Sequence, residues 1–271
     1  MTGKSLAVLV GASDGNLYVA KFLDSAERPN ALFNESAGYE VYRLMGLPVP
    51  AWSCLSVCSW MIDGNPDCCD SSTNGKARPH SGLCFGSRFV ACPPAHVYGM
   101  LPSSMFSRLW NREHFWLSWV VDVLTRHSDR RQALFVEDSD RQFRTVFIDH
   151  SHLFGGPDGS EHPSPVSSQY LDPRIYAHPN PGMKKRLLER LRRFDGDAVR
   201  HRLESLPIEW KTSSAIQSVS DSLDRLCSFD LARSICEELI ETADSQSSRK
   251  ILKITTPGHS SEAAGVAVFT H

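Results

Sequence analysis

Residues 5–22 read SLAVLVGASDGNLYVAKF, and the fold prediction starts from this stretch. Its two ends are short runs rich in β-forming residue types, and the segment between them contains Gly11 and Gly15. Two such runs around a glycine-containing turn predict a β-hairpin. Lys21 lies in the second run among apolar neighbours, where a buried charge needs an oppositely charged partner.

The segment after the hairpin predicts a helix. Apolar residues recur there at helical spacing, at Phe33, Ala37, Val41 and Leu44. Gly46 and Pro48 then end the pattern, because both residue types are typical of positions just beyond a helix. Glu35 falls in the first turn of this helix and is the candidate partner of Lys21.

The rest of the chain changes from strands to helices. Strands are predicted within 51–62 and 83–92, and a hairpin is predicted from the apolar runs at 133–136 and 145–148. Helices are predicted from an apolar stripe at 115–124 and at about 182–194, 213–228 and 230–242. Segments 63–82 and 155–181 are rich in Gly, Pro and polar residues and predict loops.

This order of elements predicts an α+β architecture of two lobes. The predicted domains are a β-rich N-terminal lobe at 1–94, a helical C-terminal lobe at 95–245 with two polar loops, and a flexible tail at 246–271. The Pro93–Pro94 pair begins the connector between the lobes. Ligands tend to bind where such lobes meet.

Composition restricts the class of protein and its partners. The chain has 271 residues, of which 41% are hydrophobic and 22% charged, as in an average globular protein with a sizeable core. A net charge of −2 gives no reason to expect direct nucleic-acid binding. No apolar run is long enough for a signal sequence or a membrane helix, so we expect a cytoplasmic protein with no membrane partner.

The cysteines do not form a metal-binding pattern. The eight are Cys54, Cys58, Cys68, Cys69, Cys84, Cys92, Cys227 and Cys236. None of them forms a Cys-x-x-Cys pair, whereas zinc sites usually show two close pairs at regular spacing. Reduced thiols are therefore expected.

Several polar residues match the needs of phosphoryl transfer. That reaction needs cations and a metal ion to neutralise phosphates, and a carboxylate to hold the nucleophile. The chain supplies, in order, the glycine turn at Gly11 and Gly15, Lys21, Glu35, Asp129 and Asp149. Each residue alone has a common structural explanation, such as a turn or an exposed charge. Their combined order and element types are what indicate a nucleotide site.

The sequence also resembles the HipA-like kinase family, particularly its short stand-alone bacterial members. The motifs that carry this resemblance are Gly11–Phe22, Asn34–Glu35, Gly46–Pro50, Phe85–Phe89, Asp129–Gln132, Phe147–His150 and Phe154–Gly156. They span roughly residues 10–160, and the helical remainder carries no sharp motif. The resemblance implies a two-lobed protein-kinase-like fold that binds ATP and Mg²⁺.

The resemblance also implies roles for individual residues. Lys21 would contact the α- and β-phosphates and pair with Glu35, and the strand ending at Phe89 would lead into the connection between the lobes. Asp129 would be the catalytic carboxylate, and Asp149 the Mg²⁺ ligand. The substrate would be a hydroxyl group on an unidentified protein or small molecule, since better-known relatives phosphorylate Ser/Thr hydroxyls, some of them within toxin–antitoxin pairs.

Two departures from the family pattern leave a second function open. His127 stands where related chains often have an asparagine, two residues before the catalytic aspartate. The second metal-binding asparagine is also missing, so Gln132 would have to replace it. The alternative is a pseudokinase that binds nucleotide or a protein partner without turnover.

A third function, from another chemistry, uses the same loops. Three imidazoles and two carboxylates could assemble a metal-dependent hydrolase from His127, Asp129, Asp149, His150 and His152. This function would leave Lys21 and Glu35 unexplained. The basic run from Lys184 to Arg202 has two further interpretations, a solvated helix face or a docking surface for an acidic partner.

Overall fold

The computed structural model describes residues 7–23, 30–64, 81–90, 96–138, 140–157, 164, 167–177, 179–180 and 182–254. Most of the loop predicted at 63–82, the Pro93–Pro94 connector and residues 255–271 of the predicted tail lie outside this part of the chain. So do Cys68, Cys69 and Cys92.

The N-terminal half contains a four-stranded antiparallel sheet in the order β1-β2-β4-β3. Its strands are β1 (Ala7–Gly11), β2 (Leu17–Lys21), β3 (Trp52–Val57) and β4 (Gly82–Arg88). The predicted hairpin is therefore confirmed. The strand predicted within 51–62 ends early, because Ser59–Asp63 form the short helix α2. Ile62 of α2 packs with Phe22 and Val57 in a small apolar cluster. The helical turn, rather than a continued strand, allows Ile62 to reach this cluster.

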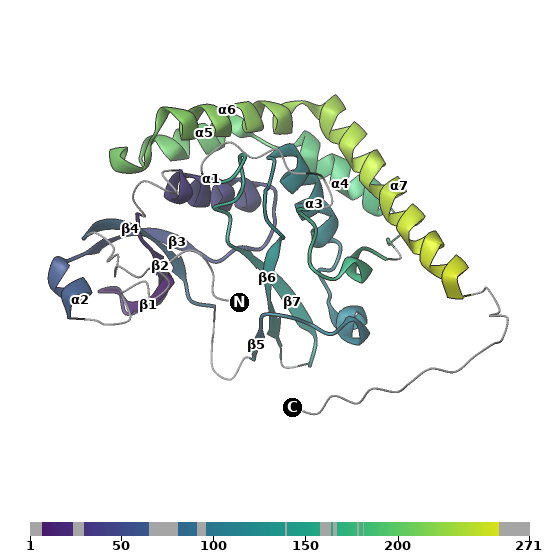
Figure 1. Ribbon diagram of the computed structural model, residues 1–271, viewed down its shortest axis with the longest axis horizontal. Coiled ribbons are helices and arrows are strands. Elements are labelled where there is room, and N and C mark those ends of the chain that lie inside the picture. The colour runs from purple at the N-terminus through teal and green to yellow at the C-terminus, as the bar shows by residue number, and fades with distance from the viewer. Residues whose placement is uncertain are drawn as a thin grey trace, which may run out of the picture.

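Helix α1 (Ala31–Leu44) follows the hairpin, as predicted. It ends before Gly46, whose φ of 71° lies in the left-handed region that favours glycine. In Figure 1, α1 lies between the N-terminal sheet and the helices α5 (Gly196–Glu204) and α6 (Ser213–Cys227). Most of α1 is buried as a result, including its charged residues Glu35 and Glu40.

A second, three-stranded sheet forms from β5 (Val97–Tyr98), β6 (Gln132–Glu137) and β7 (Phe143–Ile148). The hairpin predicted at 133–148 is confirmed as the β6–β7 pair. Helix α3 (His114–Leu124) precedes it and follows the 3₁₀ helix η2 (Ser103–Arg108). Both Trp116 and Trp119 of the apolar stripe are buried in the core.

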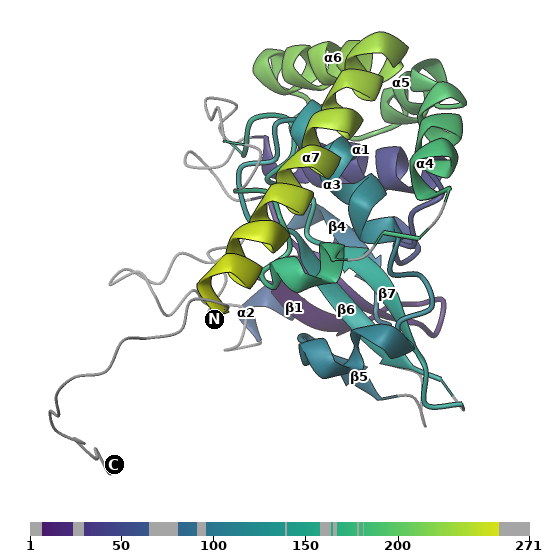
Figure 2. The ribbon, with the colours of Figure 1, turned by 90° about the vertical axis from the view of Figure 1, so that its right-hand side faces the viewer.

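The C-terminal part is helical. It contains η3 (Pro173–Tyr176), α4 (Met183–Arg192), α5, η4 (Ile208–Trp210), α6 and α7 (Phe229–Ile254). Figure 2 shows α7 running downward in front of α3, with α4, α5 and α6 in the upper part of the picture and the strands in the lower part. No helix in the described ranges is long and apolar enough to cross a membrane.

Two predictions in this region need correction. The helix predicted at about 230–242 is longer than expected, because α7 continues to Ile254, within the range predicted as the tail, and its sequence contains no Gly or Pro to stop it. The sequence reading also missed α5, whose apolar residues are few. That helix is fixed by the Asp195 side chain, which accepts a 3.0 Å hydrogen bond from the Ala198 amide, and by burial of Val199 and Leu203.

The core is arranged in two unequal clusters. The large one joins α1, α3, the β6–β7 hairpin and the C-terminal helices, whereas the small one lies beneath the N-terminal sheet. Helix α1 therefore packs with the C-terminal helices although it follows the first hairpin in sequence. The fold is mixed α and β, with an antiparallel N-terminal sheet and a helical C-terminal region.

Candidate functional site

A buried charge cluster joins three segments of the chain. Lys21 extends from β2 and places its Nζ 2.9 Å from Glu35 Oε2 of α1 and 2.8 Å from Asp149 Oδ1, just after β7. All three side chains are largely shielded from water, and the Glu35 side chain is only 1% exposed. The structure thus brings together three residues that the sequence analysis singled out separately.

The charges of this cluster shift the pKa values of its members. Burial acts to lower the pKa of Lys21, but the carboxylates of Glu35 and Asp149 outweigh it and raise that pKa well above its ordinary value. Burial likewise opposes ionisation of Asp149. The Lys21 charge and its hydrogen bond nevertheless hold the pKa of Asp149 well below its usual range. Lys21 and Asp149 are therefore both charged at neutral pH.

Asp149 is held from several directions. Its φ of 59° is left-handed, which is costly for a residue other than glycine. Ser151 Oγ donates to Asp149 Oδ1 at 3.1 Å, and Gln132 Nε2 donates to Oδ2 at 2.9 Å. Its successor, His150, donates its backbone amide to Glu35 Oε2 at 3.1 Å. Gln132, predicted as a metal ligand, therefore lies against Asp149 and presents its amide nitrogen to it.

Helix α1 is attached directly to the loop that follows Asp149. Asn34 Nδ2 lies within hydrogen-bonding distance of three carbonyl oxygens of this loop, those of Ser151 (3.3 Å), Leu153 (3.1 Å) and Gly156 (3.0 Å). One turn further along α1, a Cβ on Gly38 would lie 2.4 Å from His150 Cβ, so only glycine permits this packing. Sequence reasoning did not identify the role of Gly38, because the close approach is made by a residue distant in sequence.

A cavity of about 460 Å³ opens beside the charge cluster. Its apolar walls come from both sheets: Ala7 and Val19 from the N-terminal sheet, and Leu134 and Ile148 from the β6–β7 hairpin. Lys21, Glu35, Gln132 and Asp149 lie among the polar residues that line it, and residues 87–90 form another part of its wall, which includes Phe89. Apolar walls with a few polar groups gathered at one place are typical of a ligand-binding cavity.

The glycine turn lies between β1 and β2 and is closed by its own hydrogen bonds. The amides of Ala12 and Gly15 donate to backbone carbonyls of the turn at 2.9 and 3.0 Å, and the Asn16 amide donates to Asp14 Oδ1 at 2.9 Å. Neither Gly11 nor Gly15 lines the 460 Å³ cavity. Contact between this turn and phosphates therefore remains a prediction.

Asp129 lies in an exposed loop after α3. Its Oδ1 accepts a 2.7 Å hydrogen bond from the Arg130 amide, and its side chain is not part of the cavity wall. His127, two residues earlier, is buried instead, with its Nδ1 3.9 Å from Asp122 Oδ2. A catalytic role for Asp129 is consistent with exposure to a substrate and stays a prediction.

The metal-hydrolase alternative gains no support. Among the described residues, no group of three or more His, Cys, Asp or Glu side chains is placed to hold a metal ion. His127 and His150 are both buried, and burial together with the charge of Arg131 lowers their pKa values well below the ordinary value. The His150 ring packs against the rings of Tyr39 and Tyr42.

Half of the basic residues in the run from Lys184 to Arg202 form ion pairs on the helix surfaces. Its pairs include Lys184 with Glu237, Arg186 with Glu113, Arg200 with Asp224 and Arg202 with Glu40. This pattern favours the solvated-face interpretation over a docking surface. The described cysteines Cys54, Cys58, Cys84, Cys227 and Cys236 are free thiols, as predicted.

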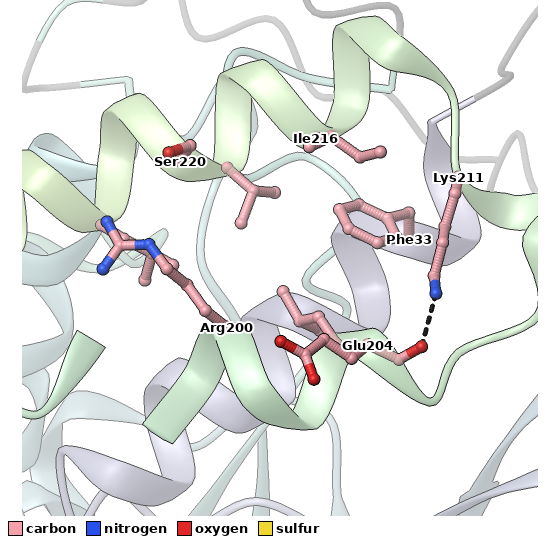
Figure 3. A pocket seen from close by; sticks show the side chains of 9 residues that line it. Phe33, Arg200, Glu204, Lys211, Ile216 and Ser220 are labelled. Carbon is pink, nitrogen blue, oxygen red and sulfur yellow. Dashed lines mark hydrogen bonds between the residues drawn. The ribbon is translucent and has the colours of Figure 1, made fainter. Parts of the chain in front are cut away.

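A second cavity, of about 300 Å³, lies between α5 and α6 above Phe33 of α1 (Figure 3). Its floor is apolar, and Arg200 and Lys211 lie toward opposite ends. Both cations already have partners, since Arg200 pairs with Asp197 and Lys211 Nζ donates to the Glu204 carbonyl at 2.6 Å. The cavity contains none of the residues that the sequence analysis proposed for chemistry.

Comparison with solved structures identifies the architecture. The chain superposes on the crystal structure of a proinflammatory kinase, CtkA, from Helicobacter pylori, with a TM-score of 0.52 over 86% of this chain and 94% of that one. The chain has a protein-kinase-like fold. Sequence identity to CtkA is 13%, so the likeness concerns the fold alone. No protein-family description and no curated protein matches the sequence.

The kinase-like fold agrees with the position of the charge cluster. In this chain, Lys21, Glu35 and Asp149 meet beside a cavity formed between the N-terminal sheet and the β6–β7 hairpin. A lysine paired with a helix glutamate, near a carboxylate suited to a metal ion, is the arrangement that phosphoryl transfer in kinases requires. The fold predicted from the sequence, with its β-rich first part and helical second part, is thus confirmed.

Proposed function

We propose that the protein is an ATP- and Mg²⁺-dependent phosphotransferase of the HipA-like type, acting in the bacterial cytoplasm on a hydroxyl of a protein or small molecule. The observation that carries this proposal is the Lys21–Glu35–Asp149 cluster at the wall of the 460 Å³ cavity, within a kinase-like fold. The motifs shared with HipA-like kinases support the finer assignment.

The residues present fit a nucleotide and its metal ion. The apolar walls suit a base, and Lys21 supplies a cation for the phosphates. Asp149 and Gln132 offer carboxylate and amide oxygens, the hard ligands that Mg²⁺ prefers. When bound, the metal ion would neutralise phosphate charge. Asp129 would accept the proton of the attacking hydroxyl and thereby orient it.

The first test is a thermal-shift titration with ATP, with and without Mg²⁺. Binding stabilises by mass action, by about 2.7 kcal/mol at a hundredfold excess over Kd. We expect a Mg²⁺-dependent rise in Tm that is lost in Lys21→Ala and Asp149→Asn. Matched controls are Lys185→Ala and Asp140→Asn, both at exposed positions outside the cavity wall, which should behave as wild type. Absence of any shift in the wild type would refute the proposal.

A second candidate is a pseudokinase that binds nucleotide without transferring phosphate. It is favoured by the Asp129 side chain, which lies outside the cavity wall, and by the buried His127. Turnover of radiolabelled ATP separates the two functions. For an active kinase, Asp129→Asn should abolish phosphate transfer while the Mg²⁺–ATP thermal shift persists. For a pseudokinase, the wild type should show the shift and no transfer to itself, to added protein or to water.

A further inference from the structure

Arg131 is a buried cation that the proposed chemistry does not use. It lies between Asp129 and Gln132 in sequence, yet it is only 2% exposed, whereas both of those neighbours are exposed. A charged side chain is rarely buried so completely unless it is paired and hydrogen-bonded. Its contacts therefore indicate what it does.

One side of the guanidinium is fixed by α3. Its Nε donates to Asp122 Oδ2 at 2.9 Å and its Nη2 to Asp122 Oδ1 at 2.7 Å, a two-point contact that sets the plane of the group. Tyr42 of α1 contacts this pair: its hydroxyl donates to Asp122 Oδ1 at 2.6 Å, and its ring lies 4.9 Å from the Arg131 Cζ. Asp122 raises the pKa of Arg131, so the guanidinium is always charged.

The other side of the guanidinium meets the backbone around Asp149. Arg131 Nη1 donates to the carbonyl oxygens of Ile148 (3.3 Å) and Asp149 (3.2 Å), and it lies 3.3 Å from His150 Nδ1. These contacts surround the left-handed residue of the loop, Asp149, whose conformation must be held by its surroundings.

We propose that Arg131 is a positioning residue for Asp149, which it fixes through the backbone from the rigid Asp122 of α3. This inference rests on the proposed function, in which Asp149 holds the metal ion. Groups behind a metal ligand orient it, and their loss typically weakens metal binding about 10–100-fold. Lysine at this position keeps the charge, but it cannot contact both carboxylate oxygens and the two carbonyls at once.

The test uses Arg131→Lys with Tyr42→Phe as its matched control. Tyr42→Phe removes a buried hydrogen bond to Asp122 but leaves the contacts between Arg131 and the loop. We expect Arg131→Lys to raise the Mg²⁺ concentration for the half-maximal ATP-dependent thermal shift about tenfold or more. Tyr42→Phe should leave that concentration unchanged even if it lowers the Tm of the free protein. Equal Mg²⁺ dependence in wild type and Arg131→Lys would overturn the proposal.

A second measurement separates this proposal from the proposed function. Hydrogen exchange of the free protein reports on the His150 amide, which is bonded to Glu35 only while the loop is in place. If the His150 amide exchanges faster in Arg131→Lys but not in Tyr42→Phe, the result supports the positioning role of Arg131. If its exchange rate does not differ between Arg131→Lys and wild type, the proposal is overturned, whether or not ATP binds. If the wild type shows no Mg²⁺–ATP thermal shift, the proposed function fails, and the exchange result alone decides whether Arg131 positions the Asp149 loop. Should Arg131→Lys not fold, Asp122→Asn takes its place, with the same expected directions.

Discussion

At the scale of single residues, the site depends on charges that are stable only together. Lys21 is buried with the carboxylates of Glu35 and Asp149, and removing Lys21 would leave two buried carboxylates without their shared cation. Arg131 and Asp122 form a second buried pair directly behind Asp149. Asp149 is thus held by Lys21 at its side chain and by Arg131 at its backbone.

The depressed pKa of Asp149 predicts how stability depends on pH. Because the folded pKa lies below the unfolded value of about 3.9, the stabilisation from Asp149 is fully present above that value. It is lost as the pH falls through the folded pKa. The difference in Tm between wild type and Asp149→Asn should therefore be constant from pH 7 to about pH 5 and shrink at lower pH.

The control for this pH series is Asp140→Asn, at an exposed turn position without an opposite charge partner in the described part of the chain. It should differ little from wild type at any of these pH values. A Tm difference for Asp149→Asn that stays the same down to pH 3 would contradict the ion pair.

At the scale of elements, helix α1 and the loop after β7 behave as one unit. Asn34, Glu35 and Gly38 all meet residues of the 149–156 loop, through side-chain hydrogen bonds or direct contact. A movement of α1 would therefore displace the Asp149 loop as well. The sequence predicted this helix but placed Glu35 in its first turn, whereas α1 begins at Ala31 and none of its first-turn residues is acidic. The sequence did not show the surface against which the helix packs.

Gly38→Ala tests this contact. Alanine normally favours a helix interior over glycine by about 1 kcal/mol, but here the added Cβ would meet His150 Cβ at 2.4 Å. We expect overpacking to dominate and to destabilise the protein by about 1–3 kcal/mol, measured by denaturant unfolding. The control is Gly99→Ala, where no atom lies within 4 Å of the added Cβ. A stabilised Gly38→Ala variant would show that the loop does not pack on α1.

At the scale of the whole molecule, α1 ties the N-terminal half to the helical C-terminal part. It shares the large apolar cluster with α3 and the C-terminal helices, and Glu40 of α1 pairs with Arg202 of α5 at 3.3 Å. The N-terminal sheet contributes Phe85 of β4 to this cluster and, among the described residues, also has a small cluster that includes Ala20 and Cys84. The two halves therefore have one main core in common, rather than one core each.

This shared core predicts a single unfolding transition. Melting curves followed by far-UV circular dichroism and by tryptophan fluorescence should coincide, because the tryptophans of α3 lie in the same cluster as α1. Two separate transitions would show that the halves unfold independently.

The sequence by itself determined the local elements and the candidate residues. Alternation and helical spacing depend on neighbours a few residues apart, so the β1–β2 hairpin, α1, α3 and the β6–β7 hairpin were predictable. The helix α5 and the end of α7 were not, because α5 has few apolar residues and α7 has no stop signal near residue 246. The kinase-like order of Lys21, Glu35, Asp129 and Asp149 was also visible in the sequence.

Only the tertiary structure decided which of these residues meet. Lys21 and Asp149 are 128 residues apart, and no local pattern encodes their 2.8 Å contact. Arg131 looked like one more charge in a polar loop, yet the packing of α3 against the β6–β7 hairpin buries it, whereas Asp129 stays exposed two residues away. The physical reason is that burial and ion pairing depend on which surfaces the fold brings together, and those surfaces come from distant segments of the chain.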